Sequence, residues 1–395
     1  MTKTISGGGA TATLDTPAAA VAGLALRMAT SWLEIATHAT ETATRYWSNA
    51  LARGATPADV FDDASAWLRT IAGRREPTWS LPNTVVASSP ITRLRDFSPE
   101  GASAAVPMLI LPPQAGHHSC IVDYSERQSQ VGVALAAGLD RLFVMEWLEA
   151  TPETASASIG DYVGSVRDAI AQIGEPVHLV GDCQGGWLAS IVAALDPDSV
   201  ASLTVGAAPI DFHAGAGPLL DNVALGAAYR GAPYRAIVSA GGGVLRGEVM
   251  VNGFIALAPE DEIKKQLDLL LDLRDPDYVR RYAEFEDWFK WTQDIAGAFY
   301  LWIVEHLFEG NELAAGTLVV EGEPVDLRRI TCPVNVLAGA RDHITPPEQA
   351  LALADLVGTP RESITAKVID AGHLGLFMGR TPLREHWAPL FASLS

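Results

Sequence analysis

Residues 177–187 are VHLVGDCQGGW, and this stretch indicates the fold. Its apolar start predicts a buried strand, and the residues after the paired glycines predict a helix. Between them lies Gly-x-Cys-x-Gly, the pattern of a nucleophile elbow with Cys183 where a serine usually stands. Gly181 and Gly185 leave room for a sharp turn, and the N-terminus of the helix favours a thiolate. The alternative is a buried structural cysteine at a strand end.

The composition excludes several classes of protein. Of 395 residues, 48% are hydrophobic, enough for a sizeable core, and the length allows a second domain to be inserted or appended. The formal charge of −19 argues against nucleic acid and anionic membranes as partners. The three cysteines, Cys120, Cys183 and Cys332, are far apart, so we expect neither a disulfide framework nor a metal site.

We expect a cytoplasmic protein. No apolar run reaches about 18 residues, so no membrane-spanning helix is predicted. The first 16 residues contain Gly7-Gly8-Gly9 and lack the pattern of a signal peptide, and we expect them to be flexible.

Two helices are predicted before the sheet, in an N-terminal helical extension over residues 1–80. Alanine-rich residues 18–53 have a broad apolar face, and Thr56-Pro57 opens a second helix that ends near Ile71. We expect both to pack on the main domain. The alternative is that part of the apolar face contacts a partner or a hydrophobic particle.

From Asn83 onward, short apolar runs alternate with helices, which indicates an α/β fold with a mostly parallel central sheet covered on both faces. The alternation stops after Pro209 and resumes at Val334. This insertion is predicted to be a mostly helical cap over the site, and its tryptophans and Phe254 either pack in its core or line a substrate tunnel. The predicted divisions are 81–210 for the first part of the core, 211–328 for the cap and 329–395 for the second part of the core.

A cysteine nucleophile needs a base and a group that orients the base. Asp342 follows one predicted strand and His373 follows the next, so both fall at carboxyl ends of sheet strands, where open α/β sheets build their sites. The order Cys183, Asp342, His373 is that of the α/β-hydrolase fold, with cysteine in place of serine. His373 would exchange the thiol proton and Asp342 would orient its ring. Asp342 has rivals in the adjacent His343 and in Asp370, which is nearer to His373 in sequence.

Acyl transfer also needs hydrogen-bond donors for an oxyanion. One is expected to be the backbone N–H of Gln184, the residue after the nucleophile, and the other a backbone N–H of the loop from Gln114 to Gly116. Three further residues are candidates for lining the substrate site, although the two histidines are equally compatible with plain loop positions: His117, His118 and Trp187.

From about Pro82 to the C-terminus, the chain resembles the superfamily of polyhydroxyalkanoate synthases and intracellular polyhydroxybutyrate depolymerases, which includes α/β-hydrolases with a cysteine nucleophile. Residues 181–186, GDCQGG, are similar to the synthases' Gly-x-Cys-x-Gly-Gly box, and residues 342–346, DHITP, to their Asp-His-Ile-x-Pro motif. Residues 372–377, GHLGLF, are similar to the depolymerases' Gly-His-Tyr-Gly-Val-Phe ending. The elbow departs from the depolymerases, which have proline where Gly185 stands.

The resemblance implies that Cys183, Asp342 and His373 form the triad of an enzyme that transfers acyl groups from 3-hydroxyacyl esters or thioesters. Hydrolysis of a polyhydroxyalkanoate-type polyester or its oligomers is slightly favoured. The alternative is a synthase or acyltransferase that uses hydroxyacyl-CoA, and an alternative of another class is a non-catalytic granule-associated protein. No cofactor is implied, and coenzyme A would enter only as part of a thioester co-substrate. The expected partners are a small-molecule or polyester substrate and a storage-granule surface, and the sequence does not fix an oligomeric state.

Overall fold

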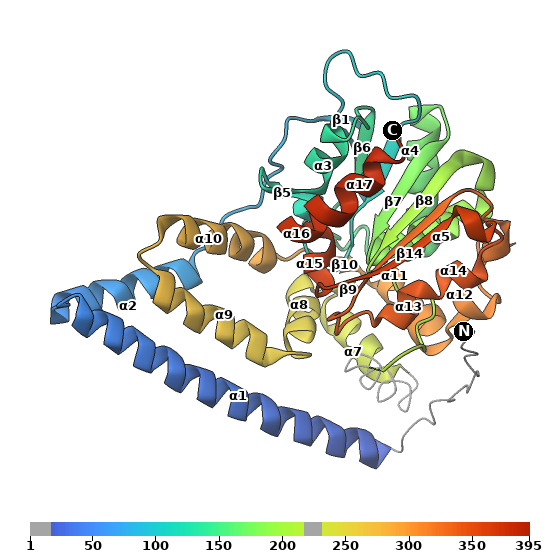
Figure 1. Cartoon of the computed structure of the whole chain (residues 1–395). Coiled ribbons are helices and arrows are strands. Elements are labelled where there is room, and N and C mark those ends of the chain that lie inside the picture. The colour runs from blue at the N-terminus through green and yellow to red at the C-terminus, as the bar shows by residue number, and fades with distance from the viewer. Residues whose placement is uncertain (1–16, 217–230) are drawn as a thin grey trace, which may run out of the picture.

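The computed structural model of the chain describes residues 17–216 and 231–395 (Figure 1). The segment expected to be flexible, residues 1–16, lies outside the described residues, and so do residues 217–230 of the expected cap.

An eight-stranded sheet in the order β1-β2-β6-β3-β7-β8-β13-β14 forms the centre of the molecule. The β1–β2 and β2–β6 pairs are antiparallel, and the pairs from β6 through β14 are parallel. The prediction of a mostly parallel sheet is therefore confirmed. The strands are β1 (Thr84–Ser88), β2 (Thr92–Asp96), β3 (Met108–Leu111), β6 (Leu142–Trp147), β7 (Val177–Asp182), β8 (Val200–Gly206), β13 (Val334–Gly339) and β14 (Ile364–Ile369).

The sheet separates two hydrophobic cores, which is why its central strands are apolar on both faces. On β7, Leu179 belongs to one core and the next residue, Val180, to the other, because successive side chains of a strand point to opposite faces. Helices α4 (Ile159–Ile173) and α5 (Gln184–Leu195) supply the first core. Helices α3 (Gln130–Ala136), α15 (His373–Met378) and α17 (Ala388–Ala392) supply the second.

Between β8 and β13 the chain leaves the sheet, and the described residues of this segment are mostly helical. Strands β9 (Val244–Leu245) and β10 (Ile295–Ala296) pair antiparallel within this segment. Its described helices are α7 (Ala232–Ala240), α8 (Gly247–Ile255), α9 (Pro259–Asp272), α10 (Pro276–Lys290), α11 (Gly297–Trp302), the π-helical η3 (Ile303–Glu309) and α12 (Glu312–Ala315).

The remaining described elements are short and connect or flank the sheet. They are η1 (Ser119–Val122), β4 (Asp123–Ser125), β5 (Gln128–Ser129), η2 (Pro197–Ser199), β11 (Val319–Val320), β12 (Glu323–Pro324), η4 (Leu327–Arg329), α13 (Pro347–Leu351), α14 (Leu353–Leu356), η5 (Arg361–Ser363), α16 (Arg380–Pro382) and η6 (Leu383–Trp387).

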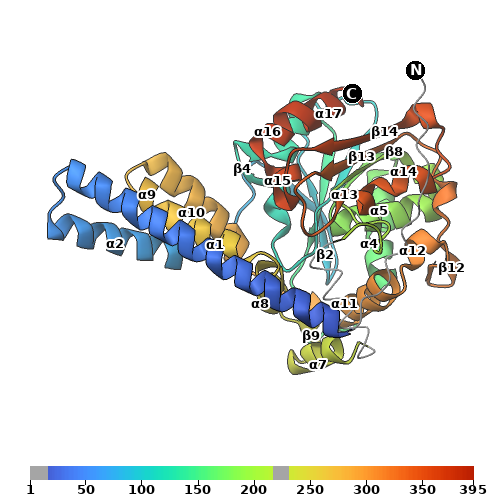
Figure 2. The same ribbon diagram turned by 60° about the horizontal axis from the view of Figure 1, so that its bottom comes forward.

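Four helices form an arm that projects from the sheet-containing body (Figures 1 and 2). This helical arm consists of α1 (Pro17–Ala52), α2 (Pro57–Ala72), α9 and α10. Thr56 caps α2 and Pro57 starts it, as the sequence predicts, and the structure adds a capping box with Asp59. The two N-terminal helices pack on the helices of the insertion, whereas we expected them on the main domain.

Polar contacts fix the register within the helical arm. Asp63 of α2 is buried and accepts hydrogen bonds from Tyr46 Oη of α1, at 2.9 Å, and from Arg274 Nη2 just beyond α9, at 3.0 Å. Trp67 Nε1 donates to the Gln266 carbonyl at 2.7 Å. The residues of the Asp63–Arg274 and Trp67–Gln266 pairs are more than 190 positions apart in sequence, so a local pattern does not predict these contacts. Among the described residues, none of the helices has both the length and the apolar character of a membrane span.

Candidate active site

Cys183 occupies a sharp turn between β7 and α5. Its φ is 51° and its ψ −117°, a conformation that residues other than glycine rarely adopt. Such a backbone costs on the order of 1–3 kcal/mol and persists only where the surroundings impose it. Here the Cys183 N–H donates to the Gly206 carbonyl of β8 at 2.7 Å, which holds the turn over the end of the sheet.

The three glycines around Cys183 are explained by close packing at this turn. A Cβ on Gly181 would lie 2.3 Å from the Gly185 carbonyl oxygen, and a Cβ on Gly185 would lie 1.9 Å from the Leu111 carbonyl oxygen of β3. A Cβ on Gly186 would lie 2.3 Å from the Ala208 Cβ. Because the start of α5 is pressed against the ends of β3 and β8, the sulfur is presented at the carboxyl edge of the sheet.

His373 and Asp342 meet at the same edge. Asp342 follows β13, His373 begins α15 after β14, and His373 Nδ1 donates to Asp342 Oδ2 at 2.7 Å. Asp342 Oδ1 accepts the backbone N–H groups of Ile344, at 2.9 Å, and Thr345, at 2.8 Å. The carboxylate is therefore fixed from both sides and orients the imidazole so that Nε2 faces Cys183.

The protonation of His373 depends on both partners. Burial alone would lower its pKa, but the charges of Asp342 and Cys183 and a hydrogen bond to each raise the pKa well above its ordinary value.

The structure thus brings Cys183, His373 and Asp342 together. The rivals of Asp342 face solvent: His343 is exposed, and the Asp370 side chain is 85% exposed and paired with Arg341.

A cavity of about 60 Å³ lies over the Cys183 sulfur, which is itself almost buried. The cap supplies three aromatic side chains to its wall, Phe254 from α8 and Trp288 and Phe289 from α10. The sequence leaves two possibilities for Phe254 and the cap tryptophans, which are lining a substrate tunnel and packing in the core of the cap. The other lining residues come from the sheet-containing body, and several of them carry no sequence feature that separates them from core residues: Pro113, Ala115, His117, Ile121, Ile344, His373, Leu374 and Phe377.

The two segments expected to supply oxyanion donors are the start of α5 and the loop after β3. Gln184 is the first residue of α5, so its N–H has no acceptor within the helix. In the loop after β3, Ala115 lines the cavity, whereas the Gln114 side chain turns away and donates from Nε2 to Tyr162 Oη at 3.0 Å. Gly116 has φ +83° and its carbonyl accepts the Gln293 N–H at 2.9 Å, which ties this loop to the cap.

The three candidate lining residues have different surroundings. His117 lines the cavity over Cys183. His118 lies outside that lining: its Nδ1 accepts the Cys120 N–H at 3.0 Å and its Nε2 is 3.4 Å from Glu146 Oε1. Trp187 is 1% exposed and also lies outside it, because its side of α5 packs into the other core, beside Phe299 and Trp302.

A second, larger cavity of about 280 Å³ adjoins the first. Phe254 belongs to the walls of both. Apart from Gln184, the residues that line the second cavity are apolar or aromatic and come from the cap: Tyr234, Ile237, Leu245, Val249, Met250, Gly253, Phe254, Leu257, Tyr300, Ile303, Val304 and Phe308.

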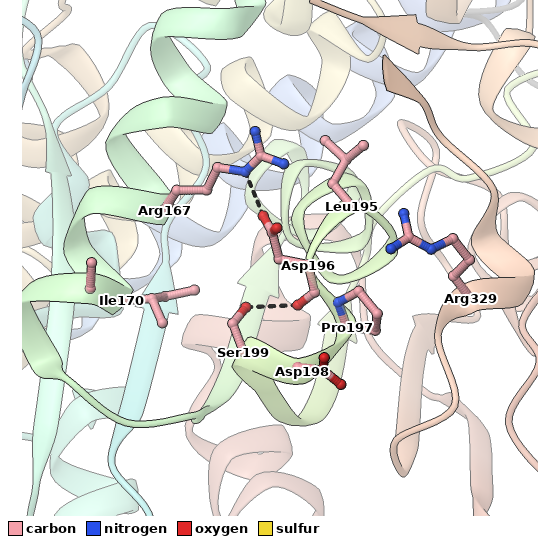
Figure 3. Close-up of a pocket in the computed structure, with 9 residues that line it drawn as sticks. Arg167, Ile170, Leu195, Asp196, Pro197, Asp198, Ser199 and Arg329 are labelled. Carbon is pink, nitrogen blue, oxygen red and sulfur yellow. Dashed lines mark hydrogen bonds and ion pairs between the residues drawn. The ribbon is translucent and has the colours of Figure 1, made fainter.

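A surface pocket of about 490 Å³ lies at the opposite, amino-terminal end of the strands (Figure 3). It surrounds the segment from Leu195 to Ser199 that leads into β8, and Arg167 pairs there with Asp196. It contains no thiol and no histidine, so its size does not make it a competing centre for acyl transfer. In the described parts of the chain, no three His, Cys, Asp or Glu side chains are grouped so as to hold a metal ion.

Residues 93–394 match the family described as protein of unknown function (DUF3141). The chain belongs to this family. This DUF3141 chain is also 28% identical over 314 residues to the poly(3-hydroxyalkanoate) polymerase subunit PhaC of Allochromatium vinosum, covering 78% of the chain and 86% of that protein. The polymerase subunit PhaC of Haloferax mediterranei is 28% identical, with 78% of the chain and 62% of that protein covered.

An uncharacterized protein of Rhizobium meliloti is 30% identical over 293 residues, which cover 71% of the DUF3141 chain and 40% of that protein. Among solved structures, a monoacylglycerol lipase from Paleococcus ferrophilus aligns with a TM-score of 0.46 and 17% identity, covering 77% of the chain and 99% of the lipase. The strand order and the elbow give the chain an α/β-hydrolase fold, in one superfamily with the polyhydroxyalkanoate synthases. It is an enzyme of that fold.

Proposed function

We propose that the chain transfers hydroxyacyl groups through a thioester on Cys183, taking them from a hydroxyacyl thioester or ester and passing them to a hydroxyl acceptor. The observation that carries the proposal is the placement of the Cys183 sulfur beside the His373–Asp342 pair at the base of an apolar cavity. The relatives named poly(3-hydroxyalkanoate) polymerase support a hydroxyacyl donor.

In the first half of the reaction, the Cys183 sulfur attacks the carbonyl carbon and His373 takes the thiol proton. The raised pKa of His373 favours this transfer, because Asp342 stabilises the imidazolium. The tetrahedral oxyanion is held by the Gln184 N–H and by a backbone donor of the loop near Ala115. The bond to the leaving thiol or alcohol then breaks, and the leaving group takes the proton from His373.

In the second half, His373 removes the proton of the acceptor hydroxyl, whose oxygen attacks the Cys183 thioester. The new ester leaves, and the sulfur regains the proton from His373. An enclosed, apolar cavity favours this outcome over hydrolysis, because it offers bulk water little access to the thioester. The adjoining 280 Å³ cavity has the size and lining for an acyl chain.

Hydrolysis is the second candidate, and the similarity of residues 372–377 to the depolymerase ending favours it. Incubation with 3-hydroxybutyryl-CoA separates the two. Polymer or oligomer formation is expected, and it should disappear in Cys183→Ala. Release of free 3-hydroxybutyrate alone would favour the hydrolase, and activity unaffected by Cys183→Ala would contradict both.

We further propose that the helical arm contacts a polyester granule. Large apolar side chains of α1 and α2 stay exposed although their helices are packed, and exposed apolar side chains that form a continuous patch mark an interaction surface. The double variant Trp32→Asp/Phe61→Asp should lose binding to polyhydroxybutyrate particles and keep its turnover of soluble thioester; unchanged binding would contradict this role. The exposed residues are Trp32, Leu33, Trp47, Leu51, Phe61 and Leu68.

A further inference from the structure

His117 is the polar side chain in the Cys183 cavity to which the reaction above gives no role. Apart from Cys183, His373 and the indole of Trp288, whose Nε1 already donates to the His118 carbonyl, the rest of the lining is apolar. His117 is 9% exposed, and its Nε2 has no hydrogen-bond partner among the described residues.

The ring of His117 is held rigidly. It stacks on Trp288, with ring centroids 4.5 Å apart and planes 25° apart, and on Phe289, with centroids 5.2 Å apart. Its backbone forms a bridge to Thr292 of the cap, next to the Gly116–Gln293 hydrogen bond. Because the position is fixed from both the body and the cap, the unpaired nitrogen is preorganised for a ligand.

The ring is neutral at physiological pH. Burial lowers the pKa of His117 to about 4. A neutral imidazole does not attract a carboxylate by charge, but it forms one good hydrogen bond with a hydroxyl group. A buried nitrogen without a partner is unfavourable, so a ligand that supplies the partner gains affinity.

We infer that His117 Nε2 binds the hydroxyl group of a hydroxyacyl unit carried on Cys183, and so selects hydroxyacyl over plain acyl donors. This inference rests on the proposed function. In the acylated enzyme the Gln184 N–H donates a hydrogen bond to the acyl carbonyl oxygen, and the sulfur is bonded to the carbonyl carbon. The hydroxyl is then the one polar group of the acyl unit without a partner, and His117 Nε2 is the unpartnered polar atom of the cavity lining that can bind it.

The test compares kcat/KM for 3-hydroxybutyryl-CoA and butyryl-CoA in the full-length protein and in two variants. His117→Phe keeps an aromatic ring for the stack on Trp288 and removes the hydrogen bond. We expect the preference of the wild type for the hydroxylated donor to fall at least about tenfold, almost entirely through that donor, because a site built for a hydroxyl discriminates through its unpaired polar group. His117→Gln, which keeps a polar terminus, should retain part of the preference.

His118→Gln serves as the matched control, because that ring lies outside the cavity, and it should leave the ratio of the two kcat/KM values unchanged. An unchanged ratio in both His117 variants would overturn the inference, and so would equal use of the two donors by the wild type. If His117→Phe does not fold, His117→Gln decides alone. Failure of the wild type to acylate Cys183 with either donor would instead overturn the proposed function.

Discussion

Replacing Asp342 by Asn tests the geometry of the site with one change of atoms. Asp342 Oδ1 accepts two backbone N–H groups, from Ile344 and Thr345, while Oδ2 accepts from His373 Nδ1. In Asp342→Asn the amide oxygen must keep accepting the N–H groups of Ile344 and Thr345, because a flipped amide would point its own NH₂ group at these two donors. The amide NH₂ then points at His373, which can only accept at Nδ1 and so carries its proton on Nε2.

A proton on Nε2 faces the Cys183 sulfur and prevents the ring from taking the thiol proton. Loss of the buried carboxylate also removes the charge that raises the pKa of His373. The comparable change of tautomer in a nucleophile–histidine–acid triad lowers kcat by about 10⁴-fold, which corresponds to about 5.5 kcal/mol of transition-state stabilisation.

The assay is the rate of CoA release from 3-hydroxybutyryl-CoA, together with the pH profile of Cys183 alkylation by iodoacetamide. Asp370→Asn is the matched control, because it makes the same chemical change at the end of the neighbouring strand on an exposed side chain. It should leave the rate within about twofold, as expected for a surface ion pair. A loss below tenfold in Asp342→Asn, or an equal loss in Asp370→Asn, would refute the reasoning.

Three further predictions concern the fold. Gly185→Ala places a Cβ 1.9 Å from a β3 carbonyl oxygen and should lower the free energy of unfolding by about 3 kcal/mol or more, whereas Gly164→Ala in α4, with open space around it, should be neutral or stabilising; equal melting temperatures would contradict the packing of the elbow. Burial raises the pKa of Asp182 well above its ordinary value, so the contribution of Asp182 to stability should fall as pH rises from the ordinary to the raised pKa, and Asp182→Asn should weaken the loss of stability with pH in urea unfolding; an unchanged pH dependence would contradict this. Asp63→Ala should destabilise the helical arm by about 1–3 kcal/mol, seen as faster amide exchange in α1 and α2, while Asp62→Ala on the exposed side should change little.

The juxtaposition of Cys183, Asp342 and His373 is predictable from sequence because each residue lies in a local pattern. Each of Cys183, Asp342 and His373 follows an apolar run that forms a parallel strand, and parallel strands bring their carboxyl ends to one edge of a sheet. The glycines beside Cys183 leave a strong local pattern, because the turn tolerates no Cβ there.

The walls of the cavity are not predictable in the same way. Phe289 and Phe377 reach the cavity only through the docking of the cap and of α15, and in sequence they are ordinary apolar residues. Trp187 was a candidate for lining the site, but it lies outside the cavity. Helix α5 is buried on all sides, so its sequence does not tell which face borders the site. The packing of α1 and α2 on α9 and α10 likewise depends on contacts between distant segments.

The central claim is that the Cys183 sulfur carries the acyl group. Intact-protein mass spectrometry of the wild type, quenched in acid after brief exposure to 3-hydroxybutyryl-CoA, should show the added mass of at least one hydroxybutyryl unit, mapped to the peptide that contains Cys183 and absent in Cys183→Ala. A wild type that turns the donor over without this adduct, or an adduct that persists in Cys183→Ala, would contradict the account.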